Sequence, residues 1–102
     1  MDFPRPNNFP YKNVFYFDGG IALMRGRYKD GEHDSIGMRW MEGESDLGYP
    51  STRGNPMWMV VPDKLAQYIL EGIFRDLEKQ RRYVIEFQEF MDALEFVRAR
   101  SV

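Results

Sequence analysis

The sequence predicts an α+β protein: an antiparallel sheet of about four strands, arranged as a meander, followed by C-terminal amphipathic helices packed on one face. Segments rich in β-forming residues and separated by turn signals run through residues 13–61. After Pro62 the apolar residues change to a helical spacing that extends to residue 100. Because 102 residues suffice for one domain, we expect residues 1–102 to form a single domain.

Residues 1–12 are expected to form an extended arm. Three prolines fall within the first ten residues, and each fixes its own φ and pushes the preceding residue toward extended geometry. Phe3 and Phe9 supply apolar side chains that would attach this arm to the body of the protein or to a neighbouring subunit.

The sheet is expected to begin with a hairpin. Residues 13–18 are rich in β-formers, and the turn signal Asp18-Gly19-Gly20 precedes a second extended run over residues 21–28. A third strand is predicted over residues 36–41, where apolar residues alternate along the chain. The fourth strand, Met57 to Val61, follows a long loop from Gly43 to Pro56.

The helical segment begins at Pro62 and Asp63, which suit the first turn of a helix. Two apolar stripes follow, separated by the polar residues 78–82, so either one long helix or two shorter helices are expected. A 4-3 spacing of apolar positions from 66 to 94 favours a continuous helix with a coiled-coil-like seam. The first stripe contains Leu65, Ala66, Ile69, Leu70, Ile73, Phe74 and Leu77.

A continuous helix from residue 63 to 100 would be about 55 Å long, so its distal half would need a cover. Either the helix folds back on itself or a second copy of the chain covers it, and we expect a homodimer. Ile85 and Phe96, which lie away from the main stripe, support this expectation. The candidate residues of this dimer or partner interface are Tyr83, Phe87, Phe90, Met91 and Leu94.

Composition excludes several classes of function. Fourteen basic and sixteen acidic residues give a net charge of −2, without the global positive field of a typical nucleic-acid binder. With no cysteine, the chain cannot form disulfides, thiolate-metal sites or iron–sulfur clusters. No apolar stretch is long enough to cross a membrane, and Asp2 stands where an export signal would carry positive charge, so we expect a cytoplasmic protein without a membrane partner.

The chain carries little that predicts catalysis. His33, flanked by acidic residues, offers a metal or pH-sensing site in principle, but an exposed turn is the simpler interpretation. Glu42 and Glu44 would share a strand face by geometry alone, and with Asp46 they only loosely resemble a calcium loop. Because nucleophile and nucleotide motifs are missing, we predict no catalytic residue, no metal and no cofactor. A small hydrolase-like enzyme without a recognisable motif stays an alternative.

The long loop and its flanking strands form the candidate ligand site. A loop of this length in a small domain needs a functional or packing reason. Its aromatic residues would line a pocket and its polar residues would bind an anionic or carbonyl group, although burial of both tryptophans in the core is the competing interpretation. The candidate ligand-binding residues are Trp40, Tyr49, Arg53, Asn55 and Trp58.

Together these patterns predict a small non-catalytic binding or interaction module, expected to be homodimeric. It would bind a small molecule in the aromatic-lined pocket or a protein partner through its helical face. The alternative is binding of RNA or single-stranded DNA by basic residues on the strands, with aromatic stacking beside them and acidic neighbours weakening the field. That alternative depends on Arg25, Arg27, Lys29 and Arg39, with Tyr28 and Trp40 for stacking.

Overall fold

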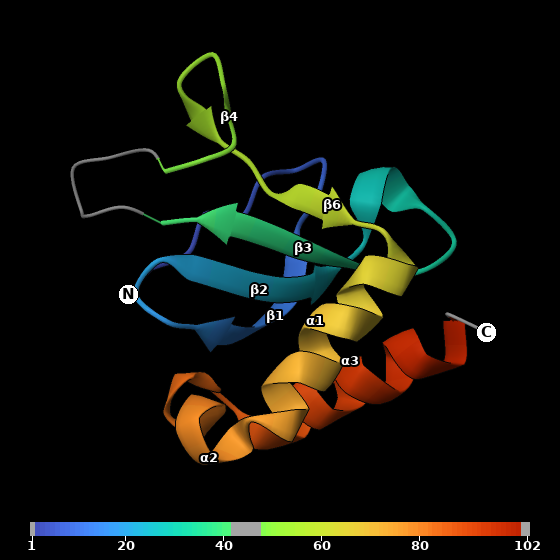
Figure 1. Ribbon diagram of the computed structural model, residues 1–102. Helices are drawn as coiled ribbons and strands as arrows, with labels where there is room; N and C mark the ends of the chain where they lie inside the picture. Colours follow the sequence, from blue (N-terminus) through green and yellow to red (C-terminus); the bar gives the residue numbers. More distant parts are fainter. Residues whose placement is uncertain (1, 42–47, 101–102) are drawn as a thin grey trace.

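The sheet has the predicted α+β arrangement. A computed structural model describes residues 2–41 and 48–100, in which four antiparallel strands pair in the order β1-β2-β3-β6. The first three strands form the meander, and β6 joins its edge beside β3. Figure 1 shows the helices gathered on one side of this sheet. The strands are β1 (Tyr11–Phe17), β2 (Ile21–Gly26), β3 (Ser35–Trp40) and β6 (Met59–Val61).

The predicted hairpin is present, and residues of the turn itself make the hydrogen bonds that stabilise it. The Asp18 carboxylate accepts hydrogen bonds from the backbone N–H groups of Gly20 (2.9 Å) and Ile21 (2.7 Å). Gly19 has a φ of +93°, a conformation that favours glycine because it has no Cβ. The short side chain and the glycine together fix the register between β1 and β2.

The long connection between β3 and β6 contains a small hairpin of its own, formed by β4 (Ser51–Thr52) and β5 (Asn55–Pro56). Its base is tethered to β3, because Trp40 and Tyr49 exchange two backbone hydrogen bonds of 2.7 and 2.8 Å. Arg39 is buried beneath this base, where its guanidinium donates to the carbonyl oxygens of Pro50 and Met57. Backbone bonds to Trp40 and side-chain bonds from the buried Arg39 therefore hold both ends of the connection against β3.

The helical segment folds back, so the favoured continuous helix is wrong. The chain turns at Val84, which is extended and forms a β-bridge with Tyr16 of β1. Beyond the turn, the Glu86 carboxylate accepts the Glu89 N–H at 2.8 Å and caps a new helix. The chain folds back because this places the second apolar stripe against its own sheet and buries it there. The elements are α1 (Asp63–Arg75), α2 (Leu77–Gln80), the 3-10 turn η2 (Arg81–Tyr83) and α3 (Phe87–Arg100).

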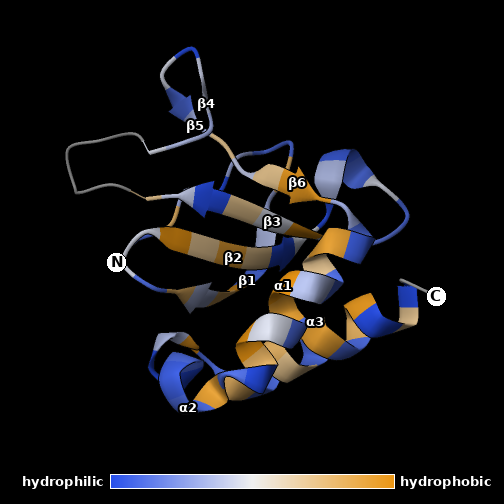
Figure 2. Ribbon diagram, in the orientation of Figure 1, coloured by the Kyte–Doolittle hydropathy of each residue, from blue (hydrophilic) through white to orange (hydrophobic). Residues whose placement is uncertain are grey.

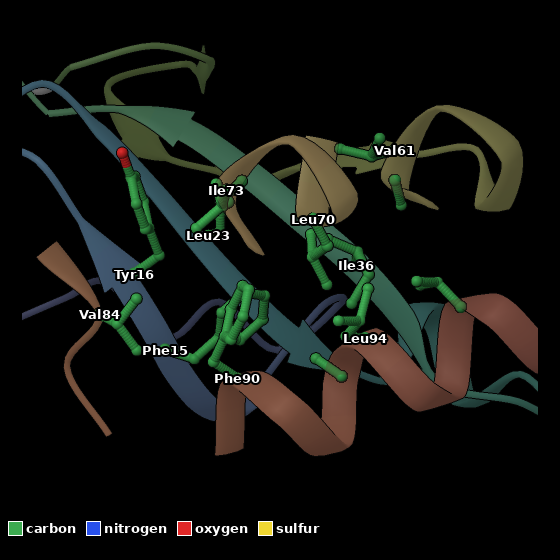
Figure 3. Close-up of a cluster of buried hydrophobic side chains, with 13 residues drawn as sticks. Phe15, Tyr16, Leu23, Ile36, Val61, Leu70, Ile73, Val84, Phe90 and Leu94 are labelled. Atoms are coloured by element: carbon green, nitrogen blue, oxygen red, sulfur yellow. The ribbon is translucent and has the colours of Figure 1, made fainter. Parts of the chain in front are cut away.

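The main core lies between the sheet and the two long helices (Figure 3). Phe15 of β1 packs against Phe90 of α3, with ring centroids 6.1 Å apart. Arg98 binds Glu71 through two hydrogen bonds of 2.7 and 2.8 Å, which tie α3 to α1. The buried members are Phe15, Tyr16, Leu23, Ile36, Val61, Ala66, Leu70, Ile73, Val84, Phe90, Ala93, Leu94 and Val97.

The N-terminal arm covers the opposite face of the sheet and builds a second core. The Trp58 indole N–H donates to the Pro4 carbonyl at 2.8 Å, and the Lys29 N–H donates to the Asn8 carbonyl at 2.7 Å. Gly26 permits this close approach, because a Cβ there would lie 2.3 Å from the Pro10 carbonyl oxygen. Both faces of the sheet are thus used by the chain itself. The buried members of this second core are Phe9, Val14, Ala22, Met24 and Trp58.

Candidate functional site

The five residues predicted to bind a ligand do not converge. Trp58 is only 4% exposed and belongs to the core beneath the arm, as the competing interpretation expected for it. Trp40 and Tyr49 are exposed at the base of the long connection, where Trp40 lies beside the β1–β2 turn. Arg53 and Asn55 are exposed in the β4–β5 hairpin. Trp58 is therefore buried in the core, whereas the other four residues are exposed.

The residues predicted to form a dimer or partner interface are used largely inside the chain. Phe90 and Leu94 are completely buried against the sheet. Tyr83, Phe87 and Met91 are partly buried around the same core. These side chains cover the sheet of their own chain, so the apolar segment is covered by folding back, the first of the two possibilities given by the sequence.

The two outlying apolar residues of the helical segment differ from one another. Ile85 is 53% exposed beside β1. Phe96 is only partly exposed, because the guanidinium of Arg25 lies 4.7 Å from its ring centroid and that of Arg100 lies 5.6 Å from it. Phe96 thus finds its cover within the chain, through cation–π contacts.

The basic residues of the nucleic-acid alternative are divided between two places. Arg39 is buried under the base of the long connection. Arg25 and Arg27 lie with Lys12 around the carboxylate of Asp34, at N–O distances of 3.0, 3.6 and 2.9 Å. Of the two residues expected to stack on bases, Trp40 is exposed, whereas Tyr28 packs edge-on against the buried Phe9 with ring centroids 5.4 Å apart.

Asp34 links neighbouring strands through ion pairs with Lys12 and Arg25. Burial by itself would raise the pKa of this carboxyl, but hydrogen bonds from Lys12 and Arg25 and the charges of both outweigh burial and hold the pKa below its usual value. Lys12 comes from β1 and Arg25 from β2, while Asp34 immediately precedes β3. One buried carboxylate therefore joins three neighbouring strands at one end of the sheet.

The residues considered for catalysis or metal binding form no site in the part of the chain that the structure describes. His33 is exposed in the turn before β3, and no group of three or more candidate ligands comes together within residues 2–41 and 48–100. Glu42, Glu44 and Asp46 lie outside the described residues. Over the same ranges, none of the helices has the length and apolar character needed to cross a bilayer.

An open depression of about 430 Å³ lies over α2 and η2. Charged and polar side chains line it, and the Tyr16 hydroxyl nearby donates to Gln80 Oε1 at 2.8 Å. A small-molecule site is normally concave and mostly apolar, with a few converging polar groups. This depression is instead open, and four of its five lining residues are charged or polar. Its lining residues are Glu78, Lys79, Gln80, Arg82 and Tyr83.

Two exposed apolar side chains, Trp40 and Met59, lie on the helix side of the sheet. Register places Met59 on the same side of the sheet as Val61, and places Trp40 on the same side as Ile36. Met59 is nevertheless 47% exposed and Trp40 is 43% exposed, because the helices cover the rest of that side.

The helix α1 follows β6 in the chain after Pro62 alone, and its outer flank also carries exposed apolar side chains. Asp63 and Glu71 of α1 pair with Arg100 and Arg98 of α3, so helical geometry turns the flank with Leu65 away from α3. Leu65 is 54% exposed, and Tyr68 beside it is 62% exposed. We name the surface formed by Trp40, Met59, Leu65 and Tyr68 the α1–β6 face.

Sequence reasoning missed this face because it assigned Leu65 to the buried stripe. The stripe in α1 is broader than one covering layer can bury, since the sheet takes Ala66, Leu70 and Ile73 and leaves Leu65 outside. Tyr68 falls outside the stripe altogether. The excess width of that stripe was the signal available in the sequence.

The α1–β6 face ends at a sheet edge without a partner strand among the described residues. Figure 2 shows β6 in hydrophobic colours at this edge. The opposite edge, along β1, is covered: Ile85 N–H donates to the Phe15 carbonyl at 2.9 Å, and Val84 bridges Tyr16. Natural edge strands are usually protected by charges, by a covering segment or by shortness. The strand β6 has three residues, Met59, Val60 and Val61, and carries no charge.

No protein-family model, curated protein or solved structure matches this chain. The geometry therefore defines its class: an α+β domain whose sheet is covered by helices on one face and by an N-terminal arm on the other, with the α1–β6 face exposed.

Proposed function

We propose that this chain is a small non-catalytic interaction module that binds a protein partner through the α1–β6 face. The observation that carries the proposal is the coincidence of four exposed apolar side chains with an uncharged sheet edge that has no partner strand within residues 2–41 and 48–100. Single exposed apolar residues are ordinary on a protein surface, whereas several of them on elements beside an open sheet edge are typical of sites that bind a partner.

This proposal keeps the class of function predicted from the sequence and moves its surface. The interface expected at residues 83–94 is largely consumed by the core, so the helical face that remains for a partner is the outer flank of α1. Two aromatic side chains, Trp40 and Tyr68, support a binding role for the α1–β6 face. Tyr and Trp are enriched at the centres of protein interfaces because they bury a large area with few rotatable bonds.

The proposal is tested by site-specific photo-crosslinking in the cells from which the gene derives. A benzoylphenylalanine at Leu65 is expected to form a discrete protein crosslink, because Leu65 lies in the face. The matched control is the same residue at Ile85, which is equally apolar and 53% exposed but lies beside the opposite sheet edge. No crosslink at either Leu65 or Tyr68, or the same products at Ile85, would contradict the proposal.

A further inference from the structure

The direction of the backbone groups along β6 follows from the pairing of β3. Trp40 exchanges both of its backbone hydrogen bonds with Tyr49, whereas the Met41 N–H donates to Gly20 on the β2 side. Backbone groups alternate along a strand, so Met38 and Ile36 also turn theirs away from β2 and toward β6. Their partners Met59 and Val61 are consequently bonded to β3, and the N–H and C=O of Val60 point outward.

We infer that the partner of the α1–β6 face is a second copy of this chain, which adds its own β6 antiparallel to the first across a two-fold axis at Val60. This inference rests on the proposed function. In such a pair, the two Val60 residues exchange both outward backbone hydrogen bonds, and two four-stranded sheets become one continuous sheet. The assembly is closed, because the segment around Val84 and Ile85 covers the remaining outer edge of each copy.

Charge favours a second copy as the occupant. The four side chains of the face and the three residues of β6 are all uncharged. Two charged side chains in the first turn of α1 are engaged within the chain: the Lys64 ammonium lies 5.6 Å from the Tyr68 ring centroid, and Asp63 is paired with Arg100 at 3.0 Å. Two identical surfaces therefore meet without placing like charges opposite each other.

The exposed area is sufficient for a weak dimer. The α1–β6 face and Val60 expose on the order of 500 Å² of side-chain surface per copy, which gives about 1,000 Å² for a pair. That total is the most that these side chains can bury, and it corresponds to the small interfaces, below about 1,200 Å², of weak and transient complexes. An unstructured peptide would pay the entropy of ordering a strand against only three residues, whereas a second β6 is already ordered by its own sheet.

The experiment measures the mass of the whole chain by light scattering and sedimentation over a concentration series. The expected mass approaches twice 12.1 kDa. Val60→Pro removes the outward N–H and is expected to raise the dissociation constant of the dimer at least about tenfold, while Val60→Thr keeps that N–H and stays within about threefold. Leu65→Glu is expected to weaken the dimer as Val60→Pro does, and Ile85→Glu is expected to leave it unchanged.

A second readout needs no variant. Hydrogen exchange at the Val60 amide of the unmodified chain is expected to slow as concentration rises, because the dimer alone protects that N–H. A chain that stays monomeric, a dimer unaffected by Val60→Pro and Leu65→Glu, or a Val60 amide whose exchange is independent of concentration would overturn the inference. In those cases, a crosslink from Leu65 to a different protein preserves the proposed function, and its absence removes both.

Discussion

The two edges of the sheet are treated in opposite ways. At the β1 edge the chain returns after α2, so that Ile85 donates to the Phe15 carbonyl and Val84 bridges Tyr16. At the β6 edge the described residues include no such cover, and apolar side chains remain exposed along it. The covered edge is built from segments distant in sequence. The fold thus uses a returning segment of the chain to cover the β1 edge and leaves the β6 edge accessible.

The cover of the β1 edge depends on α3. Phe90 lies near the start of that helix, is completely buried, and packs on Phe15, the residue whose carbonyl accepts the Ile85 bond. Burial of one side chain thus supports both the core and the edge. The β6 edge has no equivalent arrangement, since Met59 and Val60 remain exposed.

The largest expected effect comes from breaking the support of the covered edge. Phe90→Ala removes a completely buried aromatic ring and is expected to lower the free energy of unfolding by about 3–5 kcal/mol, measured by urea denaturation. A domain of this size has a total stability of roughly 5–15 kcal/mol, so the variant is expected to be marginally stable. Phe74→Ala, at a partly exposed ring on α1, serves as the control and is expected to cost about 1 kcal/mol. Equal losses would show that the core is not concentrated beneath α3.

The same substitution at the two edges separates them directly. Ile85→Pro removes the N–H that the Phe15 carbonyl accepts, and we expect a loss of about 1–3 kcal/mol in unfolding free energy. Val84 before it is already extended, as a residue preceding proline should be. Val60→Pro, studied where the chain is monomeric, is expected to cost less than about 1 kcal/mol because its N–H points outward.

Ile85→Ala is the control for the proline variant at the covered edge. It shortens a half-exposed side chain but keeps the backbone donor, so it is expected to change stability by only about 0.5 kcal/mol. If Ile85→Ala cost as much as Ile85→Pro, the side chain and not the backbone bond would hold the cover in place.

Tyr16 gives the covered edge a pH dependence. Burial and the negative charge of Asp18 raise the pKa of the Tyr16 phenol to about 12, while its hydroxyl donates to Gln80 Oε1 at 2.8 Å. The neutral phenol is the form that the fold favours. Its contribution to stability is therefore fully present below the usual phenol pKa of about 10 and is lost as the pH rises toward 12.

Tyr16→Phe removes this titration together with the hydrogen bond to Gln80. We expect a loss of about 0.5–1.5 kcal/mol at neutral pH, and a smaller difference from the unmodified chain in strong alkali. Spectrophotometric titration of the phenols, combined with unfolding at each pH, measures both effects. A Tyr16 that ionises at the usual phenol pKa of about 10 would contradict the buried, Gln80-bonded geometry.

Local signals predicted the elements well. The Asp18 carboxylate makes the hydrogen bonds of its own turn, and α1 begins at Asp63 directly after Pro62, so both boundaries agree with the structure. The alternation along β3 places Ile36, Met38 and Trp40 on one side of the strand, as predicted, but it did not predict burial, since Arg39 is buried and Trp40 is exposed. These features depend on neighbours only a few residues apart.

Features that depend on distant partners were harder to predict. The reversal at Val84 has no glycine or proline to mark it, and the 4-3 apolar spacing continues through it, so the pattern favoured one long helix. Trp58 is buried because the arm, more than fifty residues away in sequence, bonds its indole. Leu65 is exposed because the sheet accepts only part of the α1 stripe. None of these outcomes has a local cause.

Two glycines, Gly54 and Gly72, lie in the segments that flank β6 and have open space around them. A Cβ at Gly54, in the hairpin before β6, or at Gly72, in α1 after β6, would meet no atom within 4 Å. Their backbones differ, since Gly54 has a φ of +79° and Gly72 is helical. We therefore expect Gly72→Ala to raise the free energy of unfolding by about 0.4–1 kcal/mol by restricting the unfolded chain.

Gly54→Ala is expected to lower the free energy of unfolding by about 1 kcal/mol, because an L side chain is strained at positive φ. Thermal unfolding of the two variants beside the unmodified chain measures opposite shifts in Tm. A destabilising Gly72→Ala would mean that another surface approaches the flank of α1 closely. Comparison at low and high protein concentration identifies that surface: a penalty that vanishes on dilution belongs to a second copy, and one that persists belongs to the chain itself.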